Sequence, residues 1–242
     1  HQPIYGQAYL IDPRYMALNT VSLGLNVNSW ETIDTQDFIP HPSVGYFRAD
    51  VFKPGRWVSA HPLPAYENMT LRDAFWGAKQ VMSFSDEDIR AIVKTGQITN
   101  RNAEEYLTDI LIKRRDKIGR YWFSRINPID KFQAKRRNGN IVLSFSDLGV
   151  QSNLYKEKES HYDYTVSVVD RKKILANQSI KNPRISVGNS LLSESNNNGN
   201  PTVLEFEIIT RRAAADVSEK PTLIYLALEE SGPRVVGVQR EE

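Results

Sequence analysis

The residues with the greatest chemical capacity are spread thinly along this chain. Its four histidines are His1, His41, His61 and His161, and none of them has the HxH or HExxH spacing that gathers imidazoles around one metal ion. His161 and Asp163 flank one residue of an expected strand, so their side chains point to the same face. A pair of this kind is common by chance, and the sequence therefore predicts no metal site.

Nucleophile and phosphate-binding motifs are also missing from the sequence. The 242 residues include no cysteine, no GxSxG elbow, no P-loop and no GxGxxG fingerprint. Carboxylates gather at 104–105, 86–88 and 229–230, and the first two groups lie where helices are expected to begin, so they complement the helix dipole. A glycosidase pair whose members lie far apart in the sequence stays open as an alternative. We predict no catalytic, cofactor-binding or metal-binding residue.

The densest charge in the sequence is basic. It comprises Lys113, Arg114, Arg115, Lys117 and Arg120, followed by the run 135–137. On a helix, positions 113, 117 and 120 share one face, and Asp109 and Asp116 lie within pairing range. We therefore favour a solvated, ion-paired face over a phosphate or anionic-lipid site. The chain carries 31 basic and 29 acidic residues, a formal charge of +2, which is too weak to indicate nucleic acid as a partner.

The elements that would position these residues begin with an irregular, looped N-terminal arm. Seven of the twelve prolines lie within the first 67 residues, so little regular structure is expected there. One short helix is predicted, with Asp12 as its cap, Pro13 at its first position and Gly24 at its end. Because such an arm cannot support itself, we expect it to wrap a surface, namely the following helices or, alternatively, a further domain or partner chain.

Strong helical signals begin at residue 70. Apolar residues recur at helical spacing over 71–82, 89–93 and 106–122. Three residue pairs have the spacing of a capping box: Thr70 with Asp73, Ser85 with Asp88, and Asn102 with Glu105. Gly96 falls where a C-terminal glycine is favoured. Together with short connections, these signals predict a small helical bundle.

After residue 127 the periodicity changes from helical to alternating. Asn138-Gly139 suits a type I′ hairpin turn. Alternating segments follow near 162–169, 203–210, 222–228 and 234–239, with weaker ones near Lys173 and Ile185 and a polar loop over 189–201. Roughly six to eight short strands with no helix between them predict an antiparallel, immunoglobulin-like β-sandwich. The fold class is therefore α+β, with the looped arm and helical segment over 1–126 and the sandwich over 127–242.

Three short segments within 67–123 are distinctive, namely DAFWGAK, TGQ and RRDKIGRYW. With them, this region resembles the closing helical region of a family of large, uncharacterised bacterial proteins. Upstream, GQAYLIDPRYMALNTVSLGL and PSVGYFRADVFKPGRW are similar to looped segments of that family, and the final RVVGVQRE is similar to its tail. The resemblance covers nearly the whole chain and implies an exported bacterial protein.

The same resemblance also implies what this chain lacks. In the family, the region preceding this one carries an HDD…N stretch and a later IDFGS-like stretch, which suggest an atypical kinase-like catalytic loop and metal-binding aspartate. Neither stretch is present in this sequence, and YLIDPRY has an aspartate after isoleucine but no following Phe-Gly. The resemblance therefore carries over no catalytic residue.

The sequence thus predicts a non-catalytic structural or interaction module of a larger extracytoplasmic bacterial protein or assembly. Its expected partner is a protein or a preceding domain of the same polypeptide. No stretch approaches the about 18 apolar residues of a membrane span. The start HQPIYGQAYL lacks the regions of a signal peptide, so we expect the chain to begin after processing or to be an internal fragment.

Two alternative functions stay open at this point. In the first, the chain is the C-terminal part of a phosphotransferase-like enzyme whose active site lies outside it. In the second, the sandwich binds a glycan, with Tyr155, Tyr162 or Tyr164 as stacking platforms. Alternating strand aromatics more often belong to a core, so we favour the core interpretation of these three rings.

Overall fold

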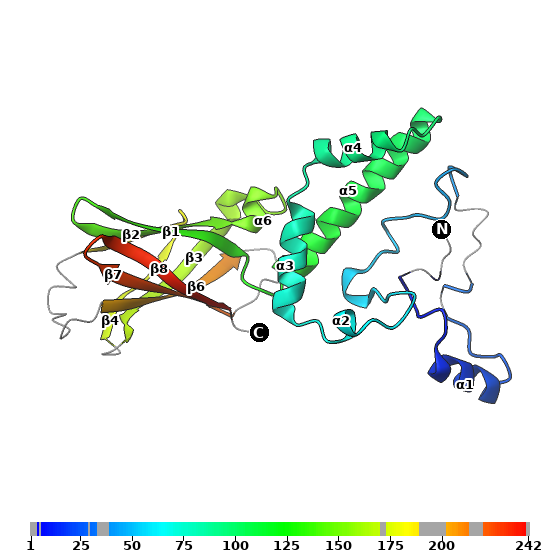
Figure 1. Cartoon of the computed structure of the whole chain (residues 1–242), viewed down its shortest axis with the longest axis horizontal. Coiled ribbons are helices and arrows are strands. Elements are labelled where there is room, and N and C mark those ends of the chain that lie inside the picture. The colour runs from blue at the N-terminus through cyan, green and yellow to red at the C-terminus, as the bar shows by residue number, and fades with distance from the viewer. Residues whose placement is uncertain are drawn as a thin grey trace. The chain divides into compact units, whose positions relative to one another are not determined.

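The computed structural model describes residues 4, 6–28, 30–32, 39–169, 173–188, 202–212 and 220–240 (Figure 1). The chain divides into two compact units. Unit 1 comprises His1–Thr70 and Gln80–Tyr121, and unit 2 comprises Leu71–Lys79 and Trp122–Glu242. The class is α+β, as predicted, with a helical region followed by two antiparallel sheets. The predicted polar loop over 189–201 lies outside the described residues.

The arm forms the first part of unit 1 and contains the predicted short helix, α1 (Pro13–Val21). The Asp12 side chain accepts hydrogen bonds from the backbone N–H groups of Arg14 and Tyr15, as expected for a cap. Gly24 lies just beyond the helix at φ 82°, where a side chain would be strained. The rest of the arm is irregular apart from η1 (Pro54–Arg56), α2 (Pro64–Glu67) and an isolated bridge between Gly6 and Val58.

Unit 1 also contains two further helices, α4 (Asp86–Thr95) and α5 (Arg101–Phe123). The last two residues of α5 belong to unit 2. The predicted capping box of α4 is confirmed, because Ser85 and Asp88 bond each other's backbone N–H groups. The prediction for the start of α5 is wrong by two residues. Asn100, and not Asn102, caps the helix by accepting hydrogen bonds from the N–H groups of Asn102 and Ala103, at 2.9 and 3.3 Å.

The end of α4 also differs from the glycine-terminated helix that was predicted. Gly96 is the C-cap but has φ −71°, so its freedom to adopt positive φ is not used. Gln97 takes the left-handed conformation instead, at φ 49°. The chain therefore turns one residue later than the glycine signal indicates.

Unit 2 begins with most of α3 (Leu71–Met82), which starts directly after Thr70 as predicted. Its buried face consists of Ala74, Phe75 and Ala78. The Phe75 ring lies 5.7 Å from that of Phe123, in a tilted arrangement typical of packed aromatic pairs.

Two antiparallel sheets make up the rest of unit 2. One has the strand order β1-β2-β5 and the other has the order β4-β3-β6-β7-β8. The bounds are β1 (Ile129–Arg137), β2 (Asn140–Asp147), β3 (Ser160–Val168), β4 (Lys173–Ile180), β5 (Arg184–Gly188), β6 (Thr202–Arg212), β7 (Thr222–Glu229) and β8 (Gly232–Arg240). The short helices α6 (Leu148–Gln151) and η2 (Glu157–Glu159) connect β2 to β3. Every alternating segment predicted from the sequence is a strand.

The predicted hairpin between β1 and β2 is confirmed. Asn138 and Gly139 both have positive φ, at 49° and 77°, as a type I′ turn requires. The turn fixes the register, with Arg137 opposite Asn140.

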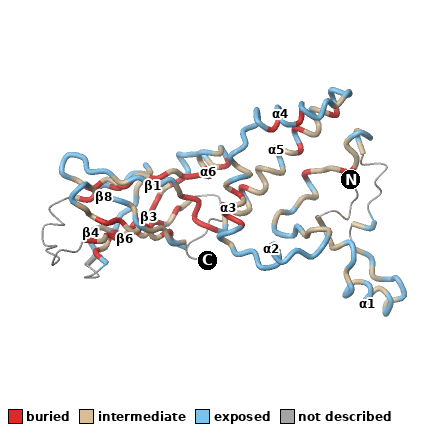
Figure 2. Tube along the Cα trace, in the orientation of Figure 1, coloured by how far each residue is buried: buried red, intermediate tan, exposed pale blue. Residues whose placement is uncertain are grey.

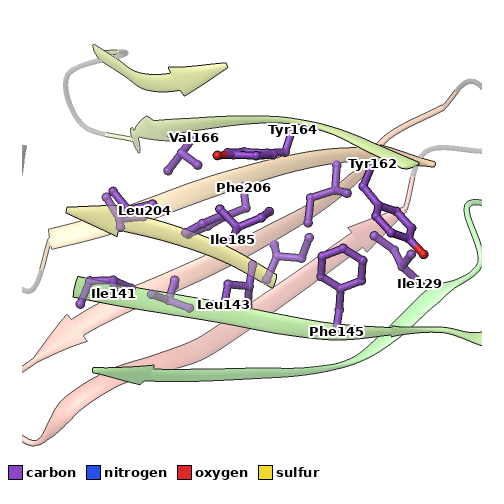
Figure 3. Close-up of a cluster of buried hydrophobic side chains, with 14 of the residues drawn as sticks. Ile129, Ile141, Leu143, Phe145, Tyr162, Tyr164, Val166, Ile185, Leu204 and Phe206 are labelled. Carbon is purple, nitrogen blue, oxygen red and sulfur yellow. The ribbon is translucent and has the colours of Figure 1, made fainter. Parts of the chain in front are cut away.

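Alternation along the strands directs one set of side chains from both sheets into a single hydrophobic core (Figures 2 and 3). Along β6, for example, Leu204, Phe206 and Ile208 are fully buried while the residues between them are partly exposed. From the other sheet, Ile141, Leu143 and Ile185 belong to the same cluster. The two sheets thus bury their inner faces together.

Candidate interaction surface

His161 and Asp163 lie on the same face of β3, as their spacing predicts, and both are partly exposed. Asp163 accepts a hydrogen bond from the Arg211 guanidinium of β6 at 3.0 Å. Burial alone would raise the pKa of Asp163, but hydrogen bonds from Ser179 and Arg211 outweigh it and lower that pKa. Asp163 thus belongs to an ion pair with Arg211 on a sheet surface. Among the residues described, no three metal-ligating side chains come together.

The structure places the three tyrosines considered for glycan stacking in or against the protein interior. Tyr162 and Tyr164 belong to the hydrophobic core, with 2% and 5% of their surface exposed (Figure 3). The Tyr155 ring is covered by the Arg212 guanidinium, 4.2 Å from the ring centroid. The core interpretation of Tyr162 and Tyr164 is confirmed, and neither ring is available to stack on a sugar.

Tyr162 also belongs to a buried polar cluster that the sequence did not indicate. Its hydroxyl donates to Asp147 at 3.0 Å, and Arg212 donates to the same carboxylate from the end of β6, at 2.5 and 2.7 Å. The side chains of Arg212 and Asp147 are only 2% and 3% exposed. Burial first, and then the Asp147 carboxylate, raise the pKa of Tyr162 well above its ordinary value. Asp147 caps α6, so the cluster anchors the β2–β3 connection to β6.

The basic run on α5 is only partly the solvated, ion-paired face that we expected. Lys113 pairs with Asp109, and Arg115 pairs with Asp116 and with Asp86 of α4. Lys117, however, donates to backbone carbonyls of the arm, including Asp50 at 3.1 Å. This part of the basic run therefore binds the backbone of the arm.

Arg114 makes the closest attachment between the arm and α5. Its guanidinium donates twice to the carbonyl oxygen of Arg48, at 2.7 and 3.0 Å. The same group lies 3.9 Å from the ring centroid of Phe47 and 4.8 Å from that of Phe52, so it makes cation–π contacts with two aromatic rings. Burial lowers the pKa of Arg114. Tyr106 adds a hydrogen bond to the carbonyl of Phe47 at 3.2 Å. This half of the arm therefore packs on α5, one of the following helices that the favoured interpretation predicted as its surface.

The other half of the arm has no such covering, and we name residues 10–27 the apolar arm segment. None of the nine residues of α1 is buried. The large apolar side chains of the segment are instead exposed: Leu10, Ile11, Met16, Leu18, Val21, Leu23, Leu25 and Val27. The extreme cases are Val21, Leu23 and Leu25, at 84%, 90% and 86%. Figure 2 shows α1 and the turn after it in the exposed and intermediate colours, with none of it in the buried colour.

A hollow of about 510 Å³ runs along this segment and is lined by Tyr15, Met16, Leu23 and their neighbours. Tyr15 supports it from one side, because its hydroxyl donates to the Glu31 carboxylate and also lies 3.3 Å from the carbonyl oxygen of Asn26. The segment carries only two charged side chains, Asp12 and Arg14. Its chemistry is that of an apolar contact surface, and large exposed apolar patches on folded proteins mark interaction sites.

Sequence reasoning could locate this segment but could not establish its exposure. The sequence places Met16, Ala17, Thr20 and Val21 on one face of this helix, but the structure leaves all four exposed. No protein-family model matches the chain, and no curated protein matches it either. Within the described residues, no helix is long and apolar enough to cross a membrane.

Proposed function

We propose that this chain is a non-catalytic interaction module whose apolar arm segment binds a protein partner or a preceding domain of the same polypeptide. One observation carries the proposal: eight large apolar side chains within residues 10–27 are exposed. Removing apolar surface from water is favourable by about 25 cal/mol per Å², which offsets the entropic cost of association. A helix as short as α1 also needs packing for its stability. A partner would supply that packing.

The proposal extends to the setting of the module. We place it in a larger extracytoplasmic bacterial protein or assembly, supported by the resemblance of DAFWGAK and RRDKIGRYW to a family of exported bacterial proteins and by the absence of cysteine. In the alternative form of this proposal, the larger protein is phosphotransferase-like and its active site lies outside this chain. Binding through the apolar arm segment is compatible with both forms of the proposal. In the alternative form, the segment would bind the catalytic region.

We further propose that the two sheets of unit 2 form an immunoglobulin-like sandwich. Support comes from the strand order. If β1, β2 and β5 are named A, B and E, and β3, β4, β6 and β7 are named C, C′, F and G, the two sheets have the orders A-B-E and C′-C-F-G. β8 is then an additional strand beside G. Sandwiches of this kind present binding surfaces on a rigid scaffold, which suits an interaction module.

A photo-crosslinking amino acid placed at Leu23 tests the binding function directly. In the producing organism, we expect irradiation to join this position to one specific protein or to a preceding region of the same polypeptide. A matched probe at Lys135, which is exposed on the β1 strand of unit 2, serves as the control and should give no such product. Equal labelling from both positions, or none from position 23, would contradict the proposal.

A further inference from the structure

Unit 1 has a second open surface whose chemistry differs from that of the apolar arm segment. A groove of about 780 Å³ follows the pair of helices α4 and α5. From α4 it is lined by Arg90 and Lys94, which lie one helical turn apart. From α5 it is lined by Glu104 and Asp109, and by Arg101 and Glu105, which pair with each other on that helix. The α4 wall is therefore basic and the α5 wall is acidic overall.

The opposite charges of the two walls do not neutralise each other within the chain. Across the part of the chain that the structure describes, Arg90 and Lys94 form no ion pair. Among the described residues, Asp109 pairs with Lys113 of its own helix, and this pair is exposed and therefore weak. Apart from the Arg101–Glu105 pair, the groove thus presents two cations on one side and two carboxylates on the other, with no net charge from these four.

Apolar side chains also line the groove. Ile98 of the connection and Ile112 of α5 are both only partly buried there. A partner must therefore offer an acidic ridge, a basic ridge and some apolar surface between them.

We propose that this groove is an interface between two copies of the chain. A two-fold axis across the groove would lay α4 of one copy along α5 of the other, because an isologous contact pairs each surface with its own complement. Arg90 and Lys94 of each copy would then face the carboxylates of Glu104 and Asp109 in the other. The four helices would form a bundle with the isoleucines inside it.

Charge complementarity distinguishes this occupant from others. A nucleic acid or an anionic lipid surface would be attracted by the basic wall but repelled by the acidic wall beside it. A second copy supplies both signs in the required positions. This interface is independent of the apolar arm segment and of the binding function proposed for it.

Sedimentation analysis of the full chain tests the interface. We expect a dimer that weakens as the salt concentration rises from about 0.1 M to about 1 M, because screening shortens from about 10 Å to about 3 Å. The double variant Arg90→Glu/Lys94→Glu and the double variant Glu104→Lys/Asp109→Lys should each dimerise at least about tenfold more weakly, because like charges then face each other. An equimolar mixture of the two variants should recover the dimer, since their walls are complementary again.

Control variants separate charge pairing from loss of structure. Lys135→Glu/Arg137→Glu changes the net charge equally on β1 and should leave the dimer intact. Arg90→Gln/Lys94→Gln removes the cations without repulsion and should weaken it, while circular dichroism shows unchanged helix content. A monomeric wild type, a dimer unaffected by the charge reversals, a mixture that does not recover it, or a control that also loses it would each overturn the proposal.

Discussion

The apolar side chains of unit 2 and those of the apolar arm segment are alike in type and opposite in placement. Leu204 and Leu226 are fully buried between the sheets, whereas Leu23 and Leu25 are 90% and 86% exposed. The difference lies in what surrounds each backbone. In the sheets, neighbouring strands fix the register and a second layer covers the inner face. α1 is a single short helix with no buried residue.

This contrast shows which part of the molecule buries its own apolar side chains. Unit 2 closes its own core, so its strands need no further chain. The apolar arm segment has the side chains of a core and only one layer of structure. We propose that a partner supplies its burial, and the following variants measure how far the two regions differ.

The largest effect is expected where unit 2 buries charge. Arg212→Ala would leave the Asp147 carboxylate buried with only the Tyr162 hydroxyl and backbone N–H groups as partners. Removing one member of a buried pair costs about 3–5 kcal/mol, because the remaining charge loses its compensation. Urea denaturation followed by circular dichroism of the strands measures this loss. A change below about 1 kcal/mol would show that water reaches Asp147 and that unit 2 is less sealed than its burial indicates.

A matched pair of substitutions compares the two regions directly. Leu204→Ala should reduce the free energy of unfolding by about 2–5 kcal/mol, since it opens a cavity in the core. Leu23→Ala removes the same atoms from an exposed position and should change it by no more than about 0.5 kcal/mol. The two free energies come from the same urea titration. Similar losses for both variants would mean that residue 23 is covered within the free chain.

How much of this could be predicted from the sequence depends on the range of the interaction. The cap at Asp12, the capping box of Ser85 and Asp88, and the turn at Asn138-Gly139 act over a few residues, and all are confirmed. The start of α5 was misplaced because Asn100 and Asn102 have the same capping chemistry, and only the backbone geometry selects the first.

The roles of Arg114 and Arg212 could not be predicted, because their partners lie far away in the chain. The acceptor of Arg114 is a backbone carbonyl 66 residues upstream. Every residue has a backbone carbonyl, so no residue type in the sequence marks this one as the acceptor. Arg212 meets Asp147 across 65 residues. For the apolar arm segment, composition indicated a wrapping role but left two surfaces open, and only burial shows that one half of the arm is covered.

The attachment of the covered half of the arm can be loosened selectively. Arg114→Ala removes two hydrogen bonds to the carbonyl of Arg48 and the contact with two aromatic rings. Charge-assisted hydrogen bonds contribute about 1.5–3 kcal/mol each, so we expect trypsin to cleave after the exposed Arg56 at least about tenfold faster. Lys113→Ala, which alters an exposed pair on the same helix, should leave the cleavage rate unchanged. If both variants were cleaved at the wild-type rate, the arm would be held by other contacts.

The smallest predicted effect is a pH dependence confined to unit 2. Asp130 accepts a hydrogen bond from Lys79 at 2.5 Å and lies 3.4 Å from Arg240. Burial would raise the pKa of Asp130, but the bonds from Lys79 and from backbone N–H, with the charge of Arg240, lower it overall. Because the folded pKa lies below the unfolded value of about 3.9, the stabilisation is present above about pH 5 and is lost as the pH falls through the folded pKa.

We therefore expect Asp130→Asn to reduce the free energy of unfolding by about 1 kcal/mol or less at about pH 7. At about pH 3 the reduction should be smaller. Denaturation curves of both proteins between about pH 3 and about pH 7 measure the difference. Asp163→Asn is a useful comparison, since its carboxylate pairs with Arg211 in a more exposed position and should show a weaker dependence. A constant difference across the range would mean that Asp130 acts through packing. Lowering the pH would then not weaken the contribution of Asp130 to the stability of unit 2.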